Sequence, residues 1–230
     1  DEAEKFLAGQ GYRKRDTLID SLLKDERYAE HWADVWSGII VGFDKDQRAQ
    51  GARNQGTSDI REMFEKNMPY DEFARKVITV TGYVTEGPGM MMMEQGKDEE
   101  KPVGLASYLV RQFREAGKDF PKAVAGKLTR AFMGVQIQCA QCHDHPFDKW
   151  TQEEFYGMAS FFTEVRVRRD PKDDKMRGWH VEEAQRGPIG KRMEGPNLSI
   201  PDSKSGPVKP SFIETGKGVE TGTSRRAAFA

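Results

Sequence analysis

The sequence predicts an all-α fold, an irregular multi-helix domain followed by an extended, loop-rich C-terminal segment. Three observations point to this class. Through most of the chain up to residue 165, apolar residues recur at intervals of three and four, as on the buried face of a helix. Thr151-Gln-Glu-Glu154 has the pattern of a capping box, which opens a helix. The stretch VRVRR (165–169) is the one alternating run, and it indicates at most a short edge strand.

The helical periodicity defines the individual elements. It is strongest over residues 25–41, where Tyr28, Trp32, Trp36 and Ile40 fall on one broad side. Two polar stretches that contain glycine, 44–57 and 85–102, predict loops. Further helices are expected over 14–24, 59–66, 70–82, 103–115, 120–135 and from residue 151 onward.

The pattern divides the chain into three parts. Residues 1–13 are expected to form a partly ordered N-terminal lead, and residues 14–169 a helical domain that carries the candidate site. After Asp170, proline and glycine become frequent and the apolar residues lose their period, so residues 170–230 are expected to be an extended segment. Because both ends of the sequence are abrupt, we expect a longer protein with a further domain after this segment.

Composition excludes some classes of function. The 230 residues carry a net charge of −1, with 32% charged and 37% hydrophobic residues. Charges of both signs are mixed and form no basic stripe, so nucleic acid is not an expected partner. No apolar run approaches the roughly 18 residues of a transmembrane helix, so no transmembrane segment is expected in this chain.

The stretch QCAQCHDHPFDKW (138–150) holds both cysteines of the chain and two of its four histidines. Cys139-Ala-Gln-Cys142-His143 is the C-x-x-C-H pattern of c-type haem attachment. One turn of backbone separates the two sulfurs, which can then reach the two vinyl groups on one edge of the porphyrin. The next residue, His143, can bind the iron from the proximal side. The motif therefore predicts one covalently attached haem c (heme c).

Three other interpretations of the motif stay open. A structural zinc site would use Cys139, Cys142 and two histidines, although adjacent ligands strain a tetrahedral site and a second closely spaced pair is missing. A redox disulfide of the C-x-x-C kind would ordinarily follow a strand in an α/β fold, whereas the approach here looks helical. The motif could also be vestigial and bind nothing.

A second iron ligand has several candidates. His31 lies at the edge of the apolar face of the 25–41 helix, which makes it the candidate distal ligand, although half-buried histidines often only bond a neighbour. Met133, Met158 and the run Met90–Met93 offer thioethers, and a thioether would raise the redox potential relative to an imidazole. For the methionine run, a flexible apolar tip is the favoured explanation.

The remaining polar residues near the motif are expected to support it. His145 is too close to His143 to reach the opposite face of the same haem, so we expect it to contact a propionate or a ligand, or to be a turn residue before Pro146. Asp144 and Asp148 could fix the ring N–H of either histidine, or could serve as turn residues around Pro146. His180 could cover a haem edge or lie free on the surface.

The residues above also carry a resemblance to a known family. FMGVQIQCAQCHDHPFDKWTQEEFYGMASFF (132–162) resembles the signature of the planctomycete-type cytochrome c-associated domain of unknown function, with its C-A-x-C-H-D-H-x-F-D phrase. LLKDERYAEHWADVW (22–36) is similar to the family's His-Trp-x-Asp helix, here His31, Trp32 and Asp34. NMPYDEFARKVIT (67–79) resembles a third segment of the family. The resemblance covers about residues 14–165, and the methionine run has no counterpart in it.

The resemblance implies a setting for the domain. Family members are large secreted proteins in which this domain often follows a cytochrome c-like domain and usually precedes a C-terminal planctomycete-type domain. It therefore implies an extracytoplasmic location, in the periplasm, a paryphoplasm-like space or the cell surface, and a multidomain or oligomeric assembly. It also favours His31 as a ligand, but it supplies no enzyme activity.

These observations predict a monohaem c-type cytochrome module for electron transfer, rather than an enzyme. Its partners would be a redox protein or other cytochromes. The alternative is a structural or interaction domain of a cell-surface protein, with a metal or a disulfide at Cys139 and Cys142. No placed acid pair or nucleophile in the sequence favours a hydrolase.

Overall fold

Helices dominate the computed structural model of this chain, which describes residues 1–42, 47–85, 103–170, 178–183, 197–201, 203–204, 206–219 and 224–230. Of these residues, 59% are helical and 12% lie in strands. The prediction of a mostly helical chain with a loop-rich C-terminal part is confirmed at this level. The predicted loop over 85–102, with Met90–Met93, lies almost entirely outside the described residues.

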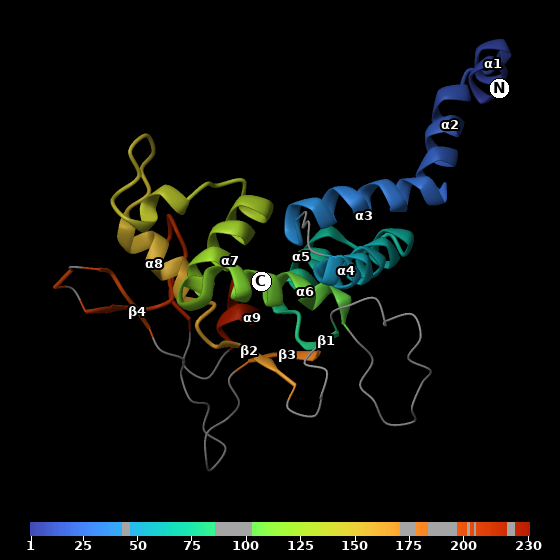
Figure 1. Cartoon of the computed structure of the whole chain (residues 1–230). Helices are drawn as coiled ribbons and strands as arrows, with labels where there is room; N and C mark the ends of the chain where they lie inside the picture. Colours follow the sequence, from blue (N-terminus) through green and yellow to red (C-terminus); the bar gives the residue numbers. More distant parts are fainter. Residues whose placement is uncertain are drawn as a thin grey trace.

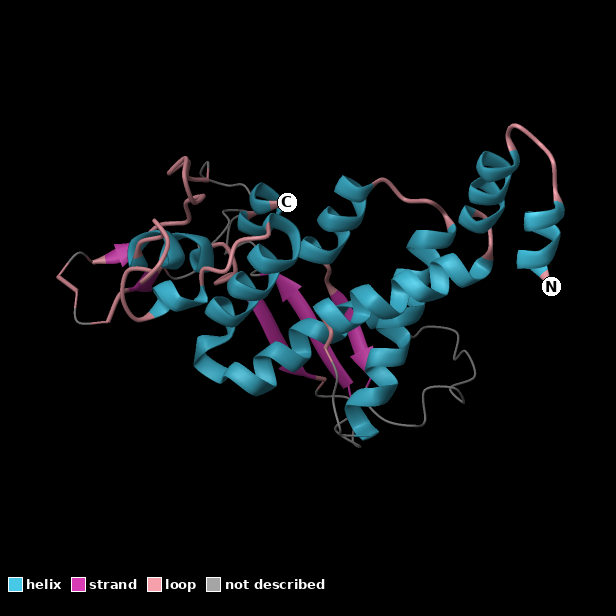
Figure 2. Ribbon diagram, turned by 90° about the horizontal axis from the view of Figure 1, so that it is seen from above, coloured by secondary structure: helices cyan, strands magenta, loops and turns pink. Residues whose placement is uncertain are grey.

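The N-terminal helices form an arm. Helix α1 (Glu2–Ala8) and helix α2 (Lys14–Leu23) bury no residue, and both extend away from the rest of the molecule in two perpendicular views (Figures 1 and 2). Helix α3 (Glu26–Ile40) joins the arm to the body and buries Ala29, Ala33, Ser37 and Ile40. The helices predicted over 14–24 and 25–41 are thus confirmed.

Helix α4 (Gln47–Glu65) corrects two predictions. Residues 47–57 belong to this helix and not to a loop, and no new helix begins after Ser58. The reason is the close approach of α4 to the short 3₁₀ helix η2 (Gly104–Ala106). A Cβ on Gly56 would lie 3.0 Å from the Gly104 carbonyl oxygen, and a Cβ on Gly104 would lie 2.3 Å from the Gln55 carbonyl carbon. These glycines therefore serve helix packing.

The remaining helices surround the main apolar core. Helix α5 (Tyr70–Thr79) buries Phe73, Val77 and Ile78. Helix α6 (Ser107–Ala116) and helix α7 (Phe120–Leu128) follow the predicted ranges, with η3 (Gly117–Asp119) between them. A π-helical turn, η4 (Thr129–Met133), extends α7. Helix α8 (Gln152–Ser160) begins at Thr151 with the predicted capping box, which is confirmed.

A small antiparallel sheet accompanies the helices, so the fold is mostly helical and not purely α-helical. Its strands are β1 (Gly82–Thr85), β2 (Val165–Arg169) and β3 (Gly178–Glu183), in the order β1-β3-β2. The alternating stretch 165–169 is strand β2, in register with β3 so that Val167 faces Val181. Helices cover one face of the sheet, as both views show (Figures 1 and 2).

The C-terminal segment is built into the same body. It supplies the central strand β3, a two-stranded ladder of β4 (Leu198–Ser199) and β5 (Pro207–Val208), and the terminal helix α9 (Arg225–Phe229). Arg226 is fully buried, and its guanidinium donates to the carbonyls of Ile78 and Val80 at 3.2 and 2.9 Å and to Glu183 at 2.8 Å. In the described part of the chain, no helix is both long and apolar enough to cross a membrane.

Candidate functional site

The two cysteines lie on one short turn at the surface. Cys139 belongs to the 3₁₀ helix η5 (Gln138–Gln141), and Cys142 is the residue that ends it. The neighbours Ile137 and Ala140 are fully buried and anchor the backbone of this turn to the core. Both thiols are exposed to solvent and free. Because the thiols are unpaired and accessible, both are available for covalent attachment.

Glutamine side chains hold this turn against the helices. The Gln138 amide donates to the carbonyl of Gly126 on α7 at 2.9 Å, and the Gln152 amide donates to the carbonyl of Gln141 at 3.0 Å. A Cβ on Gly126 would lie 2.8 Å from the Gln138 side chain, so this contact requires glycine. Hydrophobic periodicity does not identify these glutamines as structural residues, because each forms a single hydrogen bond between separate elements.

The loop after the turn is fixed to the start of helix α8. The His145 N–H donates to the carbonyl of Trp150 at 2.8 Å, and the Asp144 carboxylate accepts from the Gln152 N–H at 2.8 Å. Asp148 accepts from the Lys149 N–H at 2.8 Å. Both aspartates thus bond backbone N–H groups and not the imidazoles, which favours their interpretation as turn and cap residues.

Lys149 ties this loop to the C-terminal segment. Its ammonium lies 2.6 Å from a carboxylate oxygen of Glu214, and this hydrogen bond raises the pKa of Lys149 above its ordinary value. Both side chains are largely exposed, so the pair adds little stability. It nevertheless brings Glu214, which is distant in the sequence, beside the motif.

The ring of His143 is oriented by its own backbone. Its Nδ1 lies 2.6 Å from the carbonyl oxygen of Asp144, and a carbonyl only accepts, so Nδ1 carries the proton. In the neutral ring, Nε2 then keeps its lone pair. The side chain is exposed, which leaves Nε2 accessible to a metal ion.

The ring of His145 has the opposite arrangement. Its Nδ1 accepts the N–H of Phe147 at 3.3 Å, so the neutral ring carries its proton on Nε2. That nitrogen is a donor suited to a carboxylate oxygen and not a metal ligand. The structure therefore distinguishes two histidines that the sequence places only two residues apart.

The other candidate ligands lie elsewhere. His31 is exposed on α3, its ring edge-on to Trp32 with centroids 5.6 Å apart. The cysteine turn lies just before α8. Helix α3 and this end of α8 lie on opposite sides of α7 (Figure 1), so the structure does not bring His31 to the motif. His180 lies on β3, with its Nε2 3.6 Å from an Asp170 carboxylate oxygen.

The two candidate methionine ligands that the structure describes differ in their exposure to solvent. Met158 is fully buried in α8, whereas Met133 at the end of η4 is 42% exposed. Within the described ranges, no three His, Cys, Asp or Glu side chains are grouped to hold a metal ion.

Fold and site together define a mostly helical domain that presents a C-x-x-C-H turn at its surface. Residues 1–167 match the family PSCyt2, described as a protein of unknown function (DUF1549), and the chain belongs to this family. The match confirms the family resemblance and reaches the N-terminal arm. No curated protein and no solved structure matches the sequence.

Proposed function

We propose that this chain is a monohaem c-type electron-transfer module that functions outside the cytoplasmic membrane. The residues present fit one haem c. Cys139 and Cys142 would form the two thioether bonds, and His143 would be the proximal ligand of the iron. When bound, the haem would supply a one-electron redox centre.

One observation carries the proposal. The Asp144 carbonyl holds Nδ1–H of His143 at 2.6 Å, which leaves Nε2 as the free ligand atom directly after two exposed thiols. A hydrogen bond to the other ring nitrogen is what orients a metal-binding histidine and raises its basicity. The nearby Nε2–H of His145 is suited to donate to a haem propionate.

The distal position is a separate part of the proposal. His31 stays the candidate from the family's His-Trp-x-Asp helix, and in this conformation α3 lies across α7 from the motif (Figure 1). Ligation by His31 therefore requires either a movement of α3 or a second copy of the chain. Exposed Met133, which lies six residues before Cys139, is the alternative candidate and offers a thioether.

The proposed setting follows from the chemistry of attachment. Haem c is attached where the maturation machinery works, outside the cytoplasmic membrane, and the electron partners would be a redox protein or other cytochromes. The alternative function is a structural or interaction domain. It is favoured by the same two free thiols, since an exposed C-x-x-C turn can also close into a disulfide or hold a metal.

The test is expression with the c-type maturation machinery in an oxidising compartment. We expect a red protein with the pyridine haemochrome spectrum of haem c, and a colourless protein from the Cys139→Ala, Cys142→Ala double variant. A colourless wild type that contains stoichiometric zinc or a Cys139–Cys142 disulfide would instead support the alternative.

A further inference from the structure

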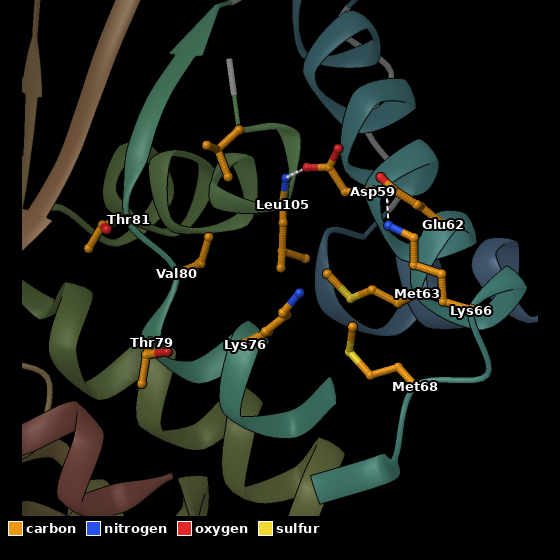
Figure 3. Close-up of a pocket in the computed structure, with 11 residues that line it drawn as sticks. Asp59, Glu62, Met63, Lys66, Met68, Lys76, Thr79, Val80, Thr81 and Leu105 are labelled. Atoms are coloured by element: carbon orange, nitrogen blue, oxygen red, sulfur yellow. Dashed lines mark hydrogen bonds and ion pairs between the residues drawn. The ribbon is translucent and has the colours of Figure 1, made fainter. Parts of the chain in front are cut away.

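A pocket far from the cysteine motif has no role in the proposed function. It lies where α4, α5 and η2 meet, and its volume is about 350 Å³, within the range of small-molecule sites. Figure 3 shows the side chains that surround it, which come from the second half of α4, the end of α5, the residues that follow these two helices, and the start of η2 with the residue before it.

The walls of this pocket are mainly apolar. Val80 and Leu105 are buried beneath it, and the half-buried thioethers of Met63 and Met68 form one side. Methionine side chains are flexible and polarizable, so they adapt to aliphatic groups of different shape. The pocket is therefore suited to a short hydrocarbon chain.

Most of the charged groups around the pocket have a partner in the described structure, and one lysine does not. Glu62 near the end of α4 forms an ion pair with Lys66, the residue after the helix, and Asp59 accepts the Leu105 N–H at 2.8 Å. Lys76 has no hydrogen bond or ion pair with any residue that the structure describes. Its ammonium points into the pocket, towards the side chains of Leu105 and Met63 (Figure 3).

We propose that this pocket binds a small organic monoanion with an aliphatic tail, such as a short-chain carboxylate. Its charged head would pair with the ammonium of Lys76, and its tail would lie against Met63, Met68 and Leu105. The apolar walls strengthen such a pair because they exclude part of the water around it. A cation is disfavoured, since the carboxylates of Glu62 and Asp59 already have partners.

The test is a ligand-observed NMR titration of the whole chain at neutral pH with three probes of equal length, hexanoate, 1-hexanol and hexylamine. We expect hexanoate to bind at least about fivefold more tightly than 1-hexanol, the size of effect that a partly exposed ion pair gives. Lys76→Met should remove this preference. Lys118→Met changes another exposed lysine, and it should leave the preference intact.

A second variant keeps the test valid should Lys76→Met fold poorly. Met68→Glu replaces an apolar contact of the tail by a negative charge, so it should weaken both ligands, but hexanoate more than 1-hexanol, and thereby reduce the preference for hexanoate. Equal affinity for hexanoate and 1-hexanol, no hexanoate binding, or tighter binding of hexylamine would each overturn the proposal. None of these outcomes depends on haem, so the two proposals stand or fall separately.

Discussion

At the scale of single residues, the two histidines of the motif loop carry the functional argument. In both His143 and His145 the Nδ1 atom is bonded to backbone, as a donor in His143 and as an acceptor in His145. The sequence could indicate that one of them follows C-x-x-C. It could not indicate their tautomers, since these depend on the fold of the 143–150 loop.

This difference predicts the behaviour of a matched pair of variants. In haem-loaded protein, His143→Ala should lose the proximal imidazole and change the spin state and absorption spectrum. His145→Ala should keep the iron ligation, because its Nε2 carries the proton and is not the ligand atom. Optical and EPR spectra check this, and an unchanged spectrum for His143→Ala would contradict the assignment.

His31 is tested by the coordination number of the iron. If His31 is the distal ligand, His31→Ala should convert a six-coordinate spectrum into a five-coordinate one. Because α3 lies across α7 from the motif, His31 can bind the iron only if α3 moves or if a second copy of the chain supplies it. In the second case we expect the fraction of six-coordinate haem to rise with protein concentration. Titration over protein concentration separates the two cases, and an unchanged spectrum removes His31.

An exposed acid at the start of α3 gives a pH prediction. Asp25 caps the helix by accepting the Arg27 N–H, and the Arg27 guanidinium is also bonded to it. These hydrogen bonds lower the pKa of Asp25 from its ordinary value of 3.8 to about 2. A lowered carboxyl pKa stabilises the fold above the ordinary value, and this contribution is lost as the pH falls towards 2.

NMR titration of the Asp25 carboxyl group checks the value directly. Arg27→Ala should move the pKa of Asp25 back towards 3.8. A titration of Asp25 near 3.8 in the unaltered protein would show that the pair does not form in solution.

At the scale of elements, the helix that follows the motif depends on its cap. The Thr151 hydroxyl accepts the Glu154 N–H, and the Glu154 carboxylate accepts the Thr151 N–H at 2.9 Å. We expect Thr151→Ala to lower the free energy of unfolding by about 1 kcal/mol. Thr151→Ser keeps the acceptor and should cost less, as urea unfolding would show; equal losses would argue against the capping role.

Two buried arginines, Arg225 and Arg226, hold the terminal helix α9 against the body. Arg226→Ala would remove the donor to the carbonyls of Ile78 and Val80 and break the ion pair with Glu183, which keeps the Ser224 hydroxyl as a donor. We expect the free energy of unfolding to fall by roughly 3–5 kcal/mol. Arg168 pairs with the adjacent Glu182 at the surface. Arg168→Ala should change stability by less than about 0.5 kcal/mol. Similar losses for the two variants in thermal unfolding would contradict this account of α9.

Local elements were the predictable part of the fold. Helices α3 and α5 follow from their apolar spacing, and α8 follows from Thr151 and Glu154. The first half of helix α4 was missed because Gly56 and its polar neighbours have the composition of a loop, whereas the contact of Gly56 with Gly104 forms only in the folded chain. Strands β1 and β3 were missed for a related reason, since each is short and pairs with residues far away in sequence.

At the scale of the whole molecule, the C-terminal segment and the helical domain form one structure. Strand β3 lies between β1 and β2, and Trp179 on β3 packs against Phe113 of α6 with ring centroids 6.3 Å apart. A chain that ends after Asp170 would lose the central strand and Arg226 together. We expect it to unfold less cooperatively than the full chain and to be cut faster by protease.

The truncated chain also tests how the motif is supported. Gln138 and Gln152 bond within the part that remains, whereas Glu214 would be lost. Haem attachment by the truncated chain should therefore persist at reduced yield. Full stability and protease resistance after truncation would show that residues 170–230 do not contribute to the core.

The central claim concerns a covalent bond between this chain and one haem, and intact mass under denaturing conditions measures it most directly. Protein produced with the maturation machinery should be heavier than the bare chain by the mass of one haem. Peptide mapping should place this added mass on the fragment that contains Cys139 and Cys142. An unmodified mass from cells that load a control cytochrome in the same experiment would contradict the claim.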